Sequence, residues 1–139
     1  MVHTGGYRMR CSELIARLEE LAPPRYAEEW DNVGLLAGRQ DKEIKRVMAA
    51  VDATGDVIEQ AHRARADFLL THHPLLFHAQ KRVCDDDFIG KRILRLIQGD
   101  ICYYAMHTNF DVMGMADAAA DELGLKNRGV LKVTCEDET

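Results

Sequence analysis

Histidine and aspartate side chains gather in three short segments of this 139-residue chain. The segments are Asp52-Ala53-Thr54, Thr71-His72-His73-Pro74 and His107-Thr108-Asn109-Phe110-Asp111. Neutral imidazole nitrogens and carboxylate oxygens suit zinc, iron, nickel or manganese better than calcium. The segments contain no cysteine, so the closed thiolate cage of a structural zinc site is not predicted. The residue types favour an open site for a divalent transition metal.

The candidate metal ligands are His72, His73, His107 and Asp111. A carboxylate such as Asp111 can bridge two ions about 3.5–4 Å apart, the spacing of two-metal hydrolytic sites. Such ions lower the pKa of bound water towards about 7. A His-His pair alone is unspecific, and His-x-x-x-Asp in a helix is also an ordinary i,i+4 contact. Only their joint placement favours the metal interpretation.

Other polar and aromatic residues receive structural or accessory roles. Asp52 and Thr54 could belong to the site, but capping of the following helix is the preferred interpretation. His78 is a candidate for acid–base work, or for a hydrogen bond to a metal ligand, because it follows the His72-His73 pair closely. We expect His62 to be solvated in a helix and Trp30 to lie in the core.

Regular elements must position these segments, and the apolar pattern predicts where the elements lie. Three apolar runs typical of buried strands end at the polar segments and span residues 47–51, 68–70 and 101–106. Apolar side chains recur at helical spacing over residues 14–21, 57–64, 89–97 and 116–123. The stretch that follows Pro23-Pro24 is predicted to be irregular through Gly34, with a turn at 31–34. A fourth strand is predicted over 130–133.

This alternation predicts an α/β fold with a mostly parallel or mixed sheet flanked by helices. The carboxyl ends of parallel strands share one edge of a sheet, where ligands bind. The three polar segments are therefore expected to meet in one crevice. We expect one domain over residues 9–139, preceded by a flexible tail at 1–8.

Composition excludes several classes of protein. The chain has 18 Lys and Arg against 23 Asp and Glu, a formal charge of −5, which argues against a basic groove for nucleic acid. The longest apolar run, at 101–106, has six residues, whereas a membrane-spanning helix needs about 20. No secretory signal is visible and the four cysteines form no CxxC motif. We therefore expect a cytoplasmic protein with reduced thiols.

Four motifs in order resemble one known family. They are the run from Ala27 to Gly38, the run from Asp52 to Ile58, His72-His73-Pro74-Leu75-Leu76-Phe77, and the run from His107 to Asp111 followed by Ala116-Asp117. Over about residues 9–125 they resemble the N-terminal half of the Nif-three-like family, also called GTP cyclohydrolase I type 2 homologues or dinuclear metal centre proteins.

The resemblance implies a dinuclear metal site within a ring-shaped homo-hexamer. His72, His73 and His107 would be terminal ligands, and Asp111 would bridge the two ions. The Trp30-Asp31-Asn32 segment would line or brace the site. The family name also implies a GTP cyclohydrolase activity.

The chain departs from the family pattern in its length. Family members are close to twice as long, and their second half adds a His-x-x-x-Glu pair whose Glu also bridges the metals. No histidine follows Asp111 here. Three imidazoles and one bridging aspartate make five bonds to metal, whereas two four-coordinate ions need about eight. Water, a ligand or another chain would have to supply the remainder.

Two classes of function follow from these observations. The first is a metal-dependent hydrolase of a nucleotide or a similar small molecule, resembling a GTP cyclohydrolase. The alternative is a non-catalytic metal-binding or regulatory interaction module, or one half of a split assembly.

Overall fold

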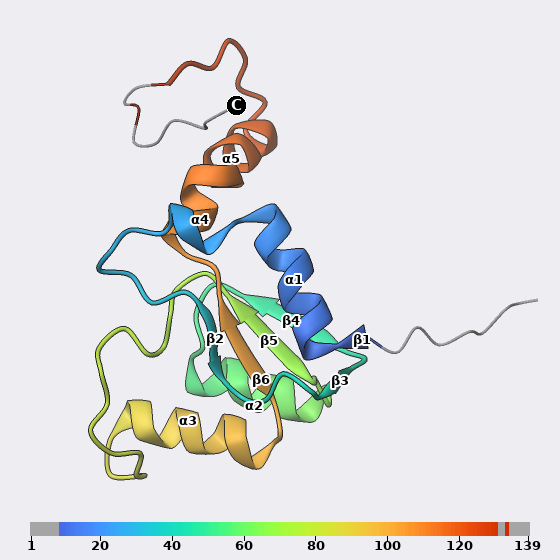
Figure 1. The fold of residues 1–139 in the computed structure, drawn as a ribbon, viewed down its shortest axis with the longest axis vertical. Coiled ribbons are helices and arrows are strands. Elements are labelled where there is room, and N and C mark those ends of the chain that lie inside the picture. Colours follow the sequence, from blue (N-terminus) through green and yellow to red (C-terminus); the bar gives the residue numbers. More distant parts are fainter. Residues whose placement is uncertain (1–8, 131–132, 134–139) are drawn as a thin grey trace, which may run out of the picture.

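A four-stranded mixed sheet forms the centre of the computed structural model, which describes residues 9–130 and 133 (Figure 1). Strands β4 (Val47–Ala50), β5 (Phe68–Thr71) and β6 (Cys102–Ala105) are parallel, and β2 (Gly34–Ala37) pairs antiparallel with β6. The strand order is β2-β6-β5-β4. The predicted α/β fold with a mixed sheet is confirmed. A separate two-stranded ribbon joins β1 (Met9–Arg10) to β3 (Glu43–Ile44).

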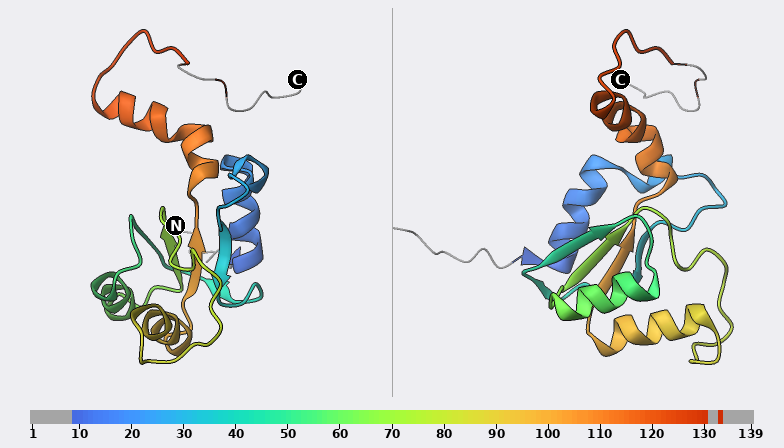
Figure 2. Two further views of the ribbon diagram at one scale, coloured as in Figure 1. Left: turned by 90° about the vertical axis from the view of Figure 1, so that its left-hand side faces the viewer. Right: turned by 180° about the vertical axis from the view of Figure 1, so that it is seen from behind.

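Helices cover both faces of the sheet. Helix α1 (Cys11–Leu21) lies on one face, and α2 (Gly55–Arg63) and α3 (Phe88–Gln98) lie side by side on the other (Figure 2). Short helical turns at η1 (Pro24–Tyr26) and α4 (Thr108–Phe110) lie near each other above the strand ends. None of the described helices is long and apolar enough to cross a membrane.

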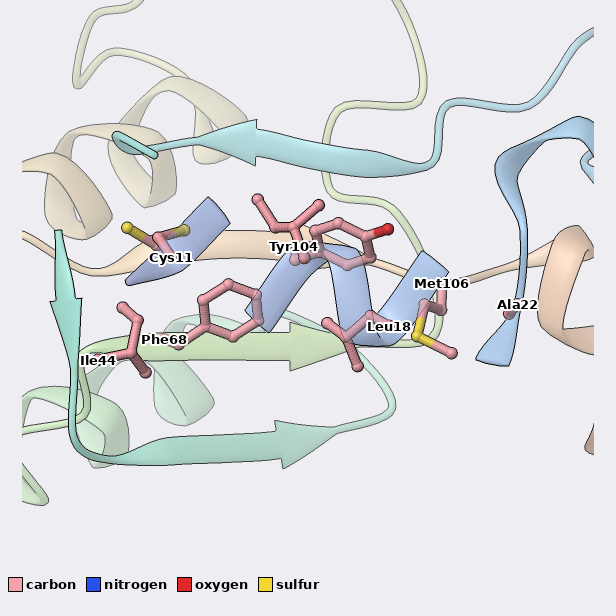
Figure 3. Close-up of a cluster of buried hydrophobic side chains, with 9 residues drawn as sticks. Cys11, Leu18, Ala22, Ile44, Phe68, Tyr104 and Met106 are labelled. Carbon is pink, nitrogen blue, oxygen red and sulfur yellow. The ribbon is translucent and has the colours of Figure 1, made fainter. Parts of the chain in front are cut away.

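Alternating side chains of β5 and β6 divide the core into two clusters. Phe68 and Tyr104 point towards α1 and pack with Leu18 (Figure 3). Leu69 and Tyr103 point to the opposite face and pack against α2 and α3. Because successive side chains of a strand alternate between faces, strands buried on both sides must be apolar throughout. This is why β5 and β6 appear in the sequence as continuous apolar runs.

The helix boundaries follow from local capping. The hydroxyl of Thr54 accepts a hydrogen bond from the backbone N–H of Val57 at 3.2 Å and begins α2. The carboxylate of Asp87 accepts from the N–H groups of Ile89 and Gly90 at 2.8 and 3.0 Å and begins α3. The helices predicted over residues 57–64 and 89–97 are confirmed, and α3 ends at its C-cap residue Gly99.

The structure corrects two predictions about strands. The run at 47–51 forms the edge strand β4. Val47 in β4 and Val51 just after it are exposed, so the strand is not covered on both faces. The fourth strand of the sheet is β2, which begins at Gly34, the last residue of the predicted turn, and for which no strand was predicted. The predicted strand at 130–133 is not seen at Val130 or Val133, and residues 131–132 lie outside the described part, as does the tail at 1–8.

The chain leaves the sheet through a continuous helical segment after β6. It consists of α4, the π-helical turn η2 (Asp111–Met115) and α5 (Ala116–Glu122). Figure 1 shows α5 projecting from the body of the molecule, and none of its residues is buried. The predicted helix at 116–123 is therefore present, but its apolar positions do not pack into the core of this chain.

Candidate metal centre

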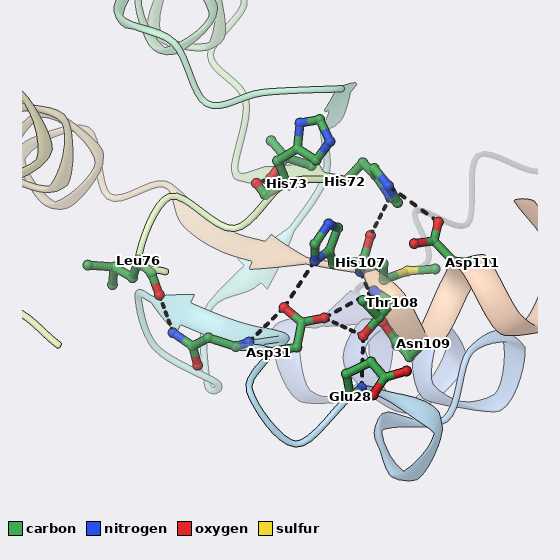
Figure 4. Close-up of polar contacts among 12 residues, drawn as sticks. Glu28, Asp31, His72, His73, Leu76, His107, Thr108, Asn109 and Asp111 are labelled. Carbon is green, nitrogen blue, oxygen red and sulfur yellow. Dashed lines mark hydrogen bonds and ion pairs between the residues drawn. The ribbon is translucent and has the colours of Figure 1, made fainter. Parts of the chain in front are cut away.

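Three imidazole rings meet at the carboxyl ends of two neighbouring parallel strands. His72 and His73 directly follow β5, and His107 follows β6 after one intervening residue. One ring nitrogen from each lies within 4.8 Å of the others. The ring centroids are 4.9 Å apart for His72 and His73, 5.0 Å for His72 and His107, and 5.5 Å for His73 and His107 (Figure 4). This cluster could hold a metal ion.

Each of these rings is oriented by an acceptor at its Nδ1 atom. His72 Nδ1 lies 2.9 Å from the carbonyl oxygen of Met106. His73 Nδ1 lies 2.7 Å from Asp52 Oδ1, and His107 Nδ1 lies 3.0 Å from Asp31 Oδ1. Carbonyl and ionised carboxylate oxygens only accept, so each Nδ1 carries the hydrogen. In a neutral ring this leaves Nε2 as the nitrogen that could bind a metal, the arrangement usual for ligating histidines.

Asp31 is the most enclosed carboxylate at the site, with a side chain that is 0% exposed. Besides His107, it accepts hydrogen bonds from the N–H of Asn32 at 2.8 Å and from the N–H of Thr108 at 3.0 Å. The hydroxyl of Thr108 also donates to it. Burial raises the pKa of Asp31, but the hydrogen bonds from Thr108 and His107 outweigh it and hold the pKa below its usual value. A negative charge is therefore fixed behind His107.

Asp111 approaches the cluster from the helical segment after β6. Its Oδ1 lies 3.4 Å from His72 Nε2 (Figure 4), and its carboxylate is partly exposed. It is the first residue of the π-helical turn η2. Irregular turns of this kind are frequent at functional sites because they redirect a side chain. The four predicted ligands thus lie together: the histidines as one group and Asp111 beside His72.

Tyr103 fixes the segment that carries the His72-His73 pair. Its buried hydroxyl accepts a hydrogen bond from the N–H of Leu75 at 2.8 Å and donates to the carbonyl oxygen of His73 at 3.1 Å. The hydroxyl of Thr71 also donates to this carbonyl, at 2.9 Å. Tyr103 was not among the residues predicted for the site. Two tyrosines, Tyr103 and Tyr104, inside an otherwise apolar strand were the available signal, because a buried phenol usually finds a polar partner.

Asp52 has a different role from the one predicted. It does not cap α2, because Thr54 does, and its carboxylate instead contacts His73. Strand β4 ends beside β5, so a residue just past β4 lies close to a residue just past β5.

Trp30, His78 and His62 lie outside the cluster. Trp30 is 58% exposed, so its predicted place in the core is wrong: the irregular segment after η1 holds it over the rings of Phe77 and His107. His78 is exposed and its ring contacts Phe77, not a member of the cluster. His62 is part-buried, and its Nε2 lies 2.9 Å from the carbonyl oxygen of Arg95, which links α2 to α3.

Comparisons with known proteins place these features in context. A family model for Duf34/NIF3 (NGG1p interacting factor 3) matches residues 9–137. A GTP cyclohydrolase 1 type 2 homolog of Clostridium perfringens is 38% identical over 125 residues, covering 88% of this chain and 47% of that protein. One from Staphylococcus epidermidis is 40% identical over 121 residues, covering 86% of this chain and 33% of that protein.

Two solved structures are similar in fold and sequence. A Bacillus cereus protein related to NIF3 superimposes with a TM-score of 0.87 at 37% identity, covering 92% of this chain and 36% of that one. Reduced HcgD from Methanocaldococcus jannaschii gives a TM-score of 0.78 at 39% identity, covering 86% of this chain and 49% of that one. The chain thus spans less than half the length of these relatives.

Proposed function

Because this chain belongs to the Duf34/NIF3 family, as its motifs indicated, we propose that it binds two divalent transition-metal ions. His72, His73, His107 and Asp111 would hold them. The observation that carries the proposal is the shared orientation of the three imidazoles, each tied through Nδ1 to an acceptor, with one nitrogen of each ring within 4.8 Å of the others. A cluster assembled only for packing has no need of three separately anchored rings.

The residues present fit an ion of the zinc, iron, nickel or manganese type. Imidazole nitrogens and an exposed carboxylate are the donors these metals prefer, and the carboxylates of Asp31 and Asp52 lie behind two of the rings. A bound ion would supply a Lewis acid and would lower the pKa of a bound water. The protein's own part is to fix the tautomers and to hold negative charge behind them.

We further propose a hydrolase that acts on a nucleotide or a similar small molecule, working as a homo-oligomer. The cyclohydrolase name of the curated relatives supports the substrate class, and the partly exposed His73 and Asp111 leave the cluster open to a ligand. The net charge of −5 favours a small molecule over nucleic acid as the partner.

A second candidate is a non-catalytic metal-binding module, or one part of a split assembly. The number of donors favours it. The three histidines and a bridging Asp111 supply five bonds, whereas two four-coordinate ions need about eight. Relatives of which this chain covers less than half carry additional chain that could complete a donor set.

Metal analysis of the purified chain tests the first proposal. Reconstitution with zinc or manganese should give about two ions per chain, and His107→Ala should lose both together. His78→Ala is the matched control, because His78 is a histidine outside the cluster. Failure of the wild-type chain to bind either ion would overturn the metal proposal. Metal-dependent hydrolysis of a nucleotide panel would favour the enzyme; stoichiometric binding with no hydrolysis would favour the second candidate.

A further inference from the structure

We propose that an open cavity beside the histidine cluster binds the planar heteroaromatic ring of a small molecule, stacked on Trp30 and Phe77. The inference rests on the proposed function, because the rest of that molecule would reach the metal site. It adds a ring-binding subsite to the four proposed ligands and names a neutral aromatic group as the part of the substrate recognised there.

The cavity has a volume of about 620 Å³. Its walls are the Trp30–Asn32 segment, the end of β2, residues 76–80 and the apolar side of α3 at Ile93 and Ile97. Binding sites for small molecules usually measure roughly 300–1,000 Å³. The space therefore suits a bicyclic ring with a sugar-sized substituent.

Two exposed aromatic side chains form one end of this cavity. Trp30 is 58% and Phe77 is 43% exposed, and their ring centroids are 5.8 Å apart at an interplanar angle of 55°. Large aromatic side chains dominate the energetics of cores and interfaces when they are buried. Because the Trp30 and Phe77 rings are tilted against each other, a ligand ring that stacks on the face of one would meet the edge of the other.

The aromatic pair is continuous with the histidine cluster. The Trp30 and His107 ring centroids are 6.2 Å apart, in edge-to-face orientation. The next residue, Asp31, lines the cavity and also holds His107 Nδ1. The side-chain amide of Asn32 donates to the carbonyl oxygen of Leu76, so the two walls that carry Trp30 and Phe77 are joined. A molecule stacked on the pair would lie within reach of His107.

The charges around the cavity select a neutral group. Among the residues that the structure describes, no lysine or arginine lines the cavity, and the one carboxylate that does, Asp31, is enclosed and saturated by donors of this chain. A phosphate or carboxylate would find no cationic partner there. The polar groups that remain on the rim, from His78 and Gln80, suit the ring nitrogens and exocyclic groups of a heterocycle.

The fluorescence of the single tryptophan provides the test, because Trp30 is the only one in the chain. Guanosine is the probe, added to the metal-loaded full chain, and D-ribose is its non-aromatic control. We expect saturable quenching of Trp30 by guanosine and none by ribose. Phe77→Ala should weaken guanosine binding about 5- to 150-fold, the range that stacking on one aromatic side chain supports.

Matched variants separate stacking from general damage. Phe88→Ala removes another aromatic ring that is 66% exposed but lies outside the cavity, and it should leave guanosine binding unchanged. Phe77→Leu keeps most of the volume without the aromatic face, so it should resemble Phe77→Ala while retaining the wild-type circular dichroism spectrum.

The outcomes distinguish this inference from the metal proposal. Bound metal without guanosine quenching would overturn the ring subsite alone, as would equal losses in Phe77→Ala and Phe88→Ala. Guanosine quenching without metal binding would contradict the metal proposal and leave the subsite standing. A Trp30 emission shift that depends only on protein concentration would assign the aromatic pair to contacts between copies and overturn the inference.

Discussion

Replacing Asp31 by Asn should damage the metal site without removing any proposed ligand. The two side chains have nearly the same shape, but only the carboxylate can accept at both oxygens. In the structure, Oδ1 accepts from His107 and from the N–H of Asn32, and Oδ2 accepts from the N–H and the hydroxyl of Thr108. Either orientation of an amide would place its NH2 group against at least one of these fixed N–H donors.

The expected loss follows from the number and burial of these contacts. Hydrogen bonds to a charged group contribute about 1.5–3 kcal/mol, and a buried donor left unsatisfied costs about 1–3 kcal/mol. We therefore expect Asp31→Asn to lower the free energy of unfolding of the metal-free chain by about 2 kcal/mol. Because His107 also loses its orienting acceptor, metal affinity should fall about 10- to 100-fold.

Zinc affinity measured by competition with a chromophoric chelator is the assay, with urea unfolding of the metal-free chain beside it. Asp52→Asn is the matched control, since Asp52 makes the equivalent contact to His73. The side chain of Asp52 is 54% exposed and that of His73 is 50% exposed, so water can replace the lost acceptor. Its zinc affinity should fall less than about tenfold, below the range for a fully supported ligand.

Two results would refute this reasoning. One is a zinc affinity for Asp31→Asn within twofold of wild type, which would mean that the carboxylate does not orient a ligand. The other is an equal loss in Asp52→Asn, which would mean that burial does not set the size of the effect.

Three further predictions concern stability and thiol reactivity. Gly38→Ala should destabilise the fold by about 1–3 kcal/mol or more, because its φ is +115° and the added Cβ would lie 2.8 Å from a backbone carbon of β6. In the control Gly55→Ala the added Cβ meets no atom within 4 Å, so the urea midpoint should be nearly unchanged. Burial raises the pKa of Asp67, but hydrogen bonds from two backbone N–H groups outweigh it, so the pKa is lowered in the folded chain. The contribution of Asp67 to stability should be fully present above the unfolded pKa of about 3.9 and be lost as the pH falls below it. Asp67→Asn should therefore show a smaller loss of urea midpoint than wild type between pH 7 and pH 3. Burial raises the pKa of Cys11 to about 12, so iodoacetamide at pH 8 should modify the exposed Cys84 and spare Cys11 in the native protein, as peptide mass mapping would show; rapid labelling of Cys11 would contradict its burial.

The local pattern of the sequence was sufficient to predict the central elements. Strands β5 and β6 are apolar on both faces because helices cover both, and that makes them visible as continuous runs. Asp87 and Gly99 mark the ends of α3 through contacts within a few residues. The prediction that His72, His73 and His107 meet needed only one further rule, that parallel strands end at the same edge.

Strand order could not be obtained in this way. The run at 47–51 has the composition of a buried strand, yet β4 lies at the edge of the sheet, where Val47 is exposed. Strand β2 was missed because it is only part-buried and begins at Gly34, which has a positive φ and ends a sequence typical of a turn. Burial depends on which neighbours a strand acquires, and sequence periodicity does not contain that information.

The sequence by itself determined which side chains could bind a metal and at which edge of the sheet they would gather, because both follow from residue type and from short-range periodicity. Only the tertiary structure decided how those side chains are held. Asp31 reaches His107 across 76 residues of chain and Asp52 reaches His73 across 21. Such contacts form where separate loops converge, and they fix the tautomers, the buried charge and the exposed Trp30 that distinguish a prepared site from a group of histidines.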